Sequence, residues 1–282
     1  MELDPRTREL LSRSRIGMLA LNGVRLPLVN PAAFSFSRGA VWMTTSRHAA
    51  KLALARRDRR AAFLVEGDGR AVVLQGMLES FDLLTPGGQL RAAVRGPGFA
   101  LSLAGYALKN APYIGGYLLD LASIPAEWWP HNRIVFRLEV DRVRQLRTDR
   151  VPPDPGGSGA LLPGVPAQVG RPLAGNHGYL CWATPRGPSL APVGWSPDGG
   201  EVLLRLPPGV GRGPAGGSAG ALVVERHHPF RATRVLGVCL RGRLHEESAG
   251  ELRLEVERAT WWQGFRVETG RVARDRPAEA PR

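Results

Sequence analysis

The residues best suited to chemistry in this chain lie in the run 41–51, which reads Val-Trp-Met-Thr-Thr-Ser-Arg-His-Ala-Ala-Lys. Its first three residues favour a strand, Ser46 is a good helix N-cap, and the residues that follow from 49 to 55 are strong helix formers. We therefore predict a strand that runs straight into a helix. Arg47 and Lys51 are four residues apart, so we expect them on one face of that helix.

The charges at the start of this helix are the reverse of the usual ones. A helix N-terminus carries positive partial charge, yet Arg47 and Lys51 lie there and no acidic residue follows before Asp58. This arrangement is favourable when a phosphate binds over the first turn. Of the 38 lysines and arginines only Lys51 and Lys109 are lysine, which favours a point-charge role for Lys51. An anion site and a solvated basic helix face are the two interpretations.

Length and composition narrow the class of protein. The 282 residues fit one large domain or two ordinary ones, and the net charge of +13 comes from arginines spread along the whole chain. With no nucleic-acid motif, we expect no nucleic-acid partner. We find no signal peptide and no uninterrupted apolar span, so we expect no membrane segment and a cytoplasmic protein. Cys181 and Cys239 are expected to be buried reduced thiols, and no ligand-spaced cluster suggests a metal.

The order of the segments predicts a mainly β protein with a helical insertion. Short strands at even spacing over 1–150 favour an antiparallel barrel, interrupted by helical segments within 86–132. That insertion is either a lid over a pocket or a cap on the barrel, and we expect two helices in it, 89–110 and 114–121. A Pro- and Gly-rich linker, a second set of strands and a disordered tail follow, at 151–175, 176–270 and 271–282.

The two halves of the chain resemble each other. Three pairs of strand-like segments match at offsets of 161, 166 and 116 residues: 17–21 with 178–182, 73–78 with 239–244, and 137–142 with 253–258. The last offset is shorter by about the length of the insertion, so the second half is the same unit without it. The helix that follows Ser46 has no counterpart, because 206–214 is rich in proline and glycine. We therefore expect at most one intact anion site of this kind per chain.

Several segments of the first half, in order and spacing, resemble the pyridoxamine 5′-phosphate oxidase-like, FMN-binding split-barrel family. The resemblance covers about 15–82 and, more loosely, 133–147. It is carried by Ile16–Ala20, Pro27–Asn30, Trp42–Arg47, Lys51, Arg56–Ala61 and Gln75–Gly76.

This resemblance implies a six-stranded split β-barrel, here in two tandem copies, with FMN bound where two barrels meet. The phosphate would be held by the segment that contains Thr44, Thr45, Ser46, Arg47 and Lys51. The strand with Pro27, Val29 and Asn30 would approach the flavin ring, largely through its backbone, and Gln75 would add a polar contact. The second half could supply the partner surface within one chain, as an intrachain pseudo-dimer, and a homodimer of the whole chain is also possible.

The function implied is that of an FMN-dependent oxidoreductase acting on a small organic substrate beneath the insertion. No catalytic residue can be named, because a flavin carries the redox chemistry and the protein only positions the substrate. Two alternatives stay open. One is a related barrel that binds a deazaflavin or haem, and the other is a non-catalytic barrel with a binding or regulatory role.

Overall fold

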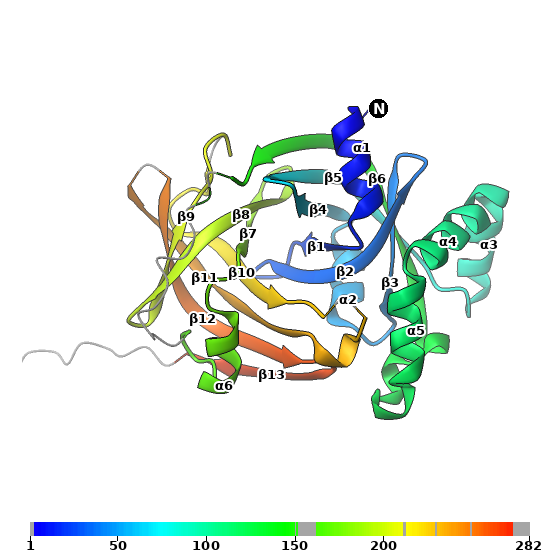
Figure 1. The fold of residues 1–282 in the computed structure, drawn as a ribbon. Helices are drawn as coiled ribbons and strands as arrows, with labels where there is room; N and C mark the ends of the chain where they lie inside the picture. Colours follow the sequence, from blue (N-terminus) through cyan, green and yellow to red (C-terminus); the bar gives the residue numbers. More distant parts are fainter. Residues whose placement is uncertain are drawn as a thin grey trace, which may run out of the picture.

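The computed structural model describes residues 3–149, 151, 162–210, 213–228, 230–248 and 250–272, and the chain is mainly β. Two barrels lie side by side, and a group of helices covers the far side of the first barrel (Figure 1). The predicted class, a mainly β fold of two tandem barrels with a helical insertion, is confirmed. In the described part of the chain, no helix is both long and apolar enough to cross a membrane.

The first barrel is a closed ring of antiparallel strands in the order β1-β2-β3-β6-β5-β4. The helix α1 (Pro5–Arg13) precedes it, and α2 (Ala50–Arg57) connects β3 to β4. Alternate side chains of the strands fill its interior, including Phe34, Met43, Phe63 and Phe136, each at most 1% exposed. The strands are β1 (Ile16–Leu21), β2 (Leu28–Ser37), β3 (Ala40–Ser46), β4 (Arg60–Gly67), β5 (Arg70–Phe81) and β6 (Arg133–Arg147).

The second barrel repeats this topology strand for strand. Its order is β7-β8-β9-β12-β11-β10, and because β10 also pairs with β7 the ring closes, with β13 added outside β12. Its strands are β7 (Gly178–Thr184), β8 (Gly187–Asp198), β9 (Glu201–Arg205), β10 (Ser218–Arg226), β11 (Leu236–Ser248), β12 (Glu251–Gln263) and β13 (Arg266–Arg271).

A shared irregularity strengthens the case for duplication. The ladder between β5 and β6 shifts register at Gly76, and the ladder between β11 and β12 shifts at Gly242, which is 166 residues further on. A Cβ at Gly76 would lie 1.8 Å from the Glu139 carbonyl oxygen, and one at Gly242 would lie 1.7 Å from that of Glu255. Both bulges therefore need glycine for the same steric reason.

The two barrels share a continuous apolar interface. Ala61, Phe63 and Val65 of β4 face the core of the first barrel, whereas Ala62 and Leu64 belong to the core that includes the second barrel. This explains why β4 is buried on both faces although its sheet is antiparallel. The barrels therefore meet over packed side chains within one chain.

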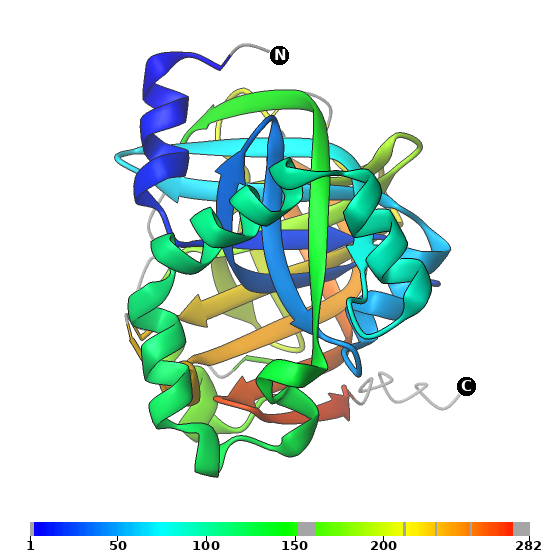
Figure 2. The same ribbon diagram turned by 90° about the vertical axis from the view of Figure 1, so that its right-hand side faces the viewer.

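The insertion contains three helices rather than the two expected: α3 (Pro86–Val94), α4 (Pro97–Lys109) and α5 (Ala111–Leu119). Gly96, with φ of 65°, breaks the first predicted helix in two. Three 3₁₀ turns follow up to Asn132. Trp42 and Phe99 stack edge to face where α4 packs on the outside of β3. The ribbon in Figure 2 shows the insertion helices lying across this side of the strands.

The predicted linker 151–175 contains a folded segment. Residues 152–161 and most of the predicted tail lie outside the described residues. From Leu162 onward the chain is folded, with a short helix α6 (Ala167–Gly170) and with Leu162, Val165 and Leu173 buried in the core of the second barrel. The prediction of a linker is wrong for this part, because apolar residues spaced among the prolines and glycines anchor it.

Candidate functional site

The split of the first barrel lies between β2 and β3. Within the described chain these strands pair only from Phe34 opposite Met43 to Ser37 opposite Ala40. Beyond that point the first half of β2 pairs with β1, and the end of β3 pairs with β6. The second barrel contacts β2 here through β10 and β11. The predicted ring-contacting and phosphate-binding segments therefore lie on the two strands that flank this split.

The end of β3 does not run straight into α2, as we expected. A turn over 47–49 separates them, α2 begins at Ala50, and its N-cap is Ala49 without a side-chain hydrogen bond. Ser46 is not the N-cap, although its Oγ accepts a hydrogen bond from the His48 N–H at 3.2 Å. Arg47 therefore lies outside the helix and shares no helix face with Lys51.

Three of the predicted phosphate ligands form hydrogen bonds or ion pairs with other parts of the protein. Their partners include the insertion and Asp82, which follows the end of β5. The Ser46 hydroxyl donates to the Glu127 carbonyl at 2.6 Å. Arg47 Nη2 forms an ion pair of 2.6 Å with the Asp82 carboxylate. This contact could not be predicted from the sequence, because Asp82 is 35 residues away from Arg47 along the chain.

Thr44 is held in a third set of contacts. Its Oγ1 lies 3.2 Å from the Tyr106 hydroxyl of α4 and accepts from Arg133 Nη2 at 2.9 Å. Arg133 also donates to the Thr44 carbonyl at 3.1 Å. In this conformation Thr44 is therefore anchored to the insertion and to the start of β6.

Lys51 and Thr45 differ from these residues, because their polar groups have no protein partner. The Lys51 ammonium makes no hydrogen bond or ion pair with any described residue, and burial together with the charge of Arg133 lowers its pKa to about 8. The Thr45 hydroxyl is also buried without a partner. A largely buried cation and a buried hydroxyl that both lack a partner among the described residues each cost free energy unless a ligand satisfies them. These two residues are the strongest indication of a ligand site.

The second barrel contributes charge to this site through Glu225, at the end of β10. Its side chain is fully buried, His227 Nδ1 lies 2.6 Å from its Oε1, and burial raises the pKa of its carboxyl while His227 and Lys51 oppose that shift. Glu225 also acts on Tyr113 of α5. Burial together with the charge of Glu225 raises the pKa of the Tyr113 hydroxyl to about 12. The site therefore combines groups from both barrels and from the insertion.

Our reading of the sequence missed Tyr113, Arg133 and Glu225. One signal for Glu225 was present, because the segment 63–66 reads Phe-Leu-Val-Glu and 222–225 reads Leu-Val-Val-Glu. In the ladders Phe63 lies opposite Leu19 and Leu222 lies opposite Leu180, which makes Glu66 and Glu225 equivalent in the two copies. Nothing in the sequence indicated that either carboxylate would face the other barrel.

The end of the insertion closes this region against the second barrel. Asp120 forms an ion pair with Arg231 and accepts a hydrogen bond from Thr233 Oγ1 at 2.6 Å. The Tyr117 and Trp128 rings pack on Phe265, with centroids 5.9 and 5.5 Å apart. The insertion thus bridges the two barrels on the side where Lys51 faces Glu225.

The predicted ring-contacting residues are spread along the interface between the barrels. Val29 is fully buried and its backbone contacts the Cys239 thiol, whereas Asn30 is partly exposed. Gln75 donates to the Pro188 carbonyl of the second barrel at 3.0 Å. Pro27 lines a cavity at the far end of β2. Both cysteines are buried free thiols, as expected.

The residues at the split fit the phosphate end of a flavin nucleotide in part. Lys51 and Thr45 offer an unpaired cation and an unpaired hydroxyl, which suit a phosphate. Ser46 and Arg47 are engaged by protein groups, so their predicted role would require exchange of partners. Among the described residues, no group of three His, Cys, Asp or Glu side chains could hold a metal ion.

The pH dependence of stability should report on Lys51. Its pKa of about 8 in the folded chain lies below the ordinary lysine value of 10.5. The unfolded chain therefore binds more protons between those pH values, and stability rises with pH across this window. At pH 7 we expect Lys51→Met to be more stable than the wild type, with the gap narrowing by roughly 1–2 kcal/mol at pH 9.5. Urea unfolding at both pH values measures this. A gap that does not change with pH would mean that Lys51 titrates normally.

No protein-family model and no curated protein matches this chain. Among solved structures, the chain is similar to a FAD-binding protein from Mesorhizobium loti, with 21% identity, 51% of this chain and 94% of that one covered, and a TM-score of 0.35. It is also similar to a candidate pyridoxamine 5′-phosphate oxidase from Listeria innocua (13% identity, 51% and 98% covered, TM-score 0.33). A haem storage protein from Vibrio cholerae is a third (13% identity, 52% and 95% covered, TM-score 0.35).

These structures are of the kind expected from the resemblance in the sequence, and each spans about half of this chain. At such overlap and identity they carry no argument about activity. What the chain binds is therefore inferred below from its own residues.

Proposed function

We propose that the chain binds one flavin nucleotide, FMN, at the split of its first barrel and acts as an oxidoreductase on a small organic substrate. The observation that carries this proposal is the pair Lys51 and Thr45, whose buried polar groups have no partner in the described protein. A phosphate offers oxygens that accept from an ammonium and from a hydroxyl, the two kinds of donor left here. When bound, the flavin would supply the hydride or electron transfer.

The residues of this chain would bind, orient and shield that group. Lys51 would neutralise the phosphate, and Thr45 would donate its hydroxyl proton to a phosphate oxygen. Burial raises the pKa of the Glu225 carboxyl, and a raised pKa weakens the repulsion between this group and a bound anion. Asn30 is the partly exposed residue of the predicted ring strand, so its side chain is open to a ligand.

The insertion would limit exchange with solvent. Its ion pair from Asp120 to Arg231 and its aromatic contacts with Phe265 hold it against the second barrel. If it acts as a lid, Arg231→Met should speed FMN release about tenfold, with little change in the association rate. Stopped-flow fluorescence measures both rates. An unchanged release rate would favour the alternative, a structural cap.

The direct test of the proposal is the visible absorption spectrum of the purified protein, with mass analysis of the molecule that heat releases. A two-band flavin spectrum and released FMN would support it. Released FAD or a deazaflavin would keep the site and change the cofactor, and a Soret band would replace the flavin by haem. A colourless protein that also fails to bind added FMN would overturn the proposal and favour a non-catalytic barrel.

A further inference from the structure

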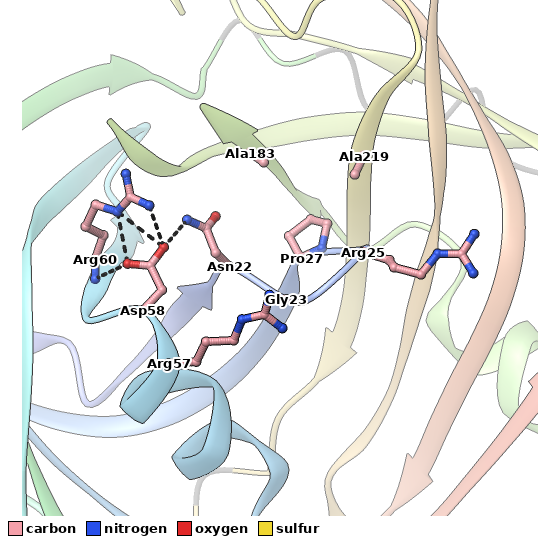
Figure 3. A pocket seen from close by; sticks show the side chains of 9 residues that line it. All are labelled: Asn22, Gly23, Arg25, Pro27, Arg57, Asp58, Arg60, Ala183 and Ala219. Atoms are coloured by element: carbon pink, nitrogen blue, oxygen red, sulfur yellow. Dashed lines mark hydrogen bonds and ion pairs between the residues drawn. The ribbon is translucent and has the colours of Figure 1, made fainter. Parts of the chain in front are cut away.

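A second cavity lies between the barrels, away from Lys51. It has a volume of about 440 Å³, which is within the range of small-molecule sites. The first barrel lines it with Asn22, Arg25, Arg57 and Arg60, and the second barrel adds two alanines (Figure 3).

The cavity is separate from the proposed phosphate site. Ala219, in its wall, and Glu225, beside Lys51, are six residues apart on β10, which corresponds to about 20 Å along a strand. Arg57 is the last residue of α2, whereas Lys51 is in its first turn, about 9 Å away along the helix axis. A ligand in this cavity would therefore not contact the Lys51 ammonium.

The two copies of the barrel have diverged at this position. In the equivalent ladders Leu21 lies opposite Ala61, and Trp182 lies opposite Gly220. One residue further along, the polar pair Asn22 and Arg60 of the first barrel therefore corresponds to Ala183 and Ala219 of the second. One side of the cavity carries hydrogen-bonding groups, and the other carries only methyl groups that leave room.

Asn22 presents an unused acceptor to the cavity. Its Nδ2 donates to Asp58 Oδ2 at 2.8 Å, and because Arg60 holds the pKa of Asp58 at about 2, this carboxylate is ionised and can only accept. The orientation of the Asn22 amide is thereby fixed, and its Oδ1 is buried without a partner. In Figure 3 this oxygen points away from Asp58, toward the space below Ala183.

The charge of the cavity is positive. Arg60 is neutralised by its ion pair with Asp58 at 2.8 Å, but Arg25 and Arg57 make no hydrogen bond or ion pair with any described residue. The exposed Arg57 side chain lies on the same side of the view as Asn22, whereas the Arg25 guanidinium extends away from both (Figure 3). A ligand that satisfies Arg57 and the Asn22 oxygen must carry a negative charge and, near it, a hydrogen-bond donor.

We propose that this cavity binds a small organic anion with a hydroxyl or amino group next to its charged group. Arg57 binds the charged group, and Asn22 Oδ1 accepts from the hydroxyl or amine. Carboxylates and phosphate esters share this chemistry. The site is independent of the proposed flavin.

The test is isothermal titration calorimetry of the full chain with four probes. Glycolate and glycerol 3-phosphate carry both a negative charge and a hydroxyl donor. Acetate carries the charge alone, and glycerol carries hydroxyl donors without a charge. We expect glycolate or glycerol 3-phosphate to bind, and the one that binds more tightly identifies the anion. Acetate should bind about tenfold more weakly than glycolate if the carboxylate is preferred, and glycerol should not bind.

Matched variants locate the binding. Arg57→Ala should weaken it about tenfold or more, whereas Arg56→Ala, an exposed neighbour outside the cavity, should leave it unchanged. Ala219→Leu, which fills the cavity from the second barrel, should abolish it. Lys51→Met should have no effect, which separates this site from the proposed flavin site. Binding of none of the probes, equal loss in Arg57→Ala and Arg56→Ala, or loss only in Lys51→Met would each overturn the proposal.

Discussion

The Lys51→Met variant is expected to bind FMN about 30-fold more weakly than the wild type, while its apoprotein is at least as stable. The affinity falls because a charge-assisted contact to phosphate is lost. The apoprotein gains because a largely buried cation without a partner is replaced by an apolar side chain of similar length. FMN fluorescence titration and thermal unfolding of the same samples measure the two effects.

Lys109 provides the matched control, because burial lowers its pKa to about 8 as well. Its surroundings differ, since Lys109 Nζ donates to the Leu11 carbonyl at 2.6 Å and lies 4.1 Å from the centre of the Phe34 ring. Lys109→Met should therefore keep FMN affinity and lose about 1–3 kcal/mol of stability. Equal FMN affinity in the two variants would remove Lys51 from the site.

The second large effect is expected at the two bulge glycines. Gly76→Ala and Gly242→Ala each place a methyl group less than 2 Å from a backbone carbonyl oxygen of the neighbouring strand, so the ladder must separate. We expect each to lose more than about 3 kcal/mol of unfolding free energy, or to fail to fold. Denaturant unfolding measures the loss.

Gly105→Ala is the control for these substitutions. Gly105 lies in the interior of α4 with open space around it, so alanine should stabilise the helix by about 0.5–1 kcal/mol. A neutral Gly242→Ala beside a costly Gly76→Ala would contradict the equivalence of the two barrels.

The strands and the duplication could be predicted because they depend on local pattern. Period-2 alternation and turns set the strands, and the repeats 17–21 and 178–182 fall on β1 and β7 as their offset requires. The predicted start of α2 is too early because it takes Ser46 as the N-cap. In the structure the Ser46 hydroxyl instead donates to the Glu127 carbonyl of the insertion. Local propensity does not include such a competing partner.

Site residues could be predicted only where residue type and neighbouring sequence were enough to identify them. The rarity of lysine singled out Lys51, and its lack of a partner in the structure agrees with a special role. The contact of Arg47 with Asp82 and the approach of Glu225 depend on how the insertion and the second barrel pack. Segments 35 or more residues apart leave no periodic signal of such a contact, so these partners could not be inferred.

The measurement that tests the proposed site most directly is an equilibrium titration of the apoprotein with FMN and, in parallel, with riboflavin. One intact site in the first barrel predicts one FMN per chain, and the Lys51 and Thr45 groups predict that riboflavin, which lacks the phosphate, binds at least about 30-fold more weakly. Two FMN per chain would mean that the second barrel also carries a site. Equal affinity for the two flavins, or no binding of FMN, would contradict a phosphate site at Lys51.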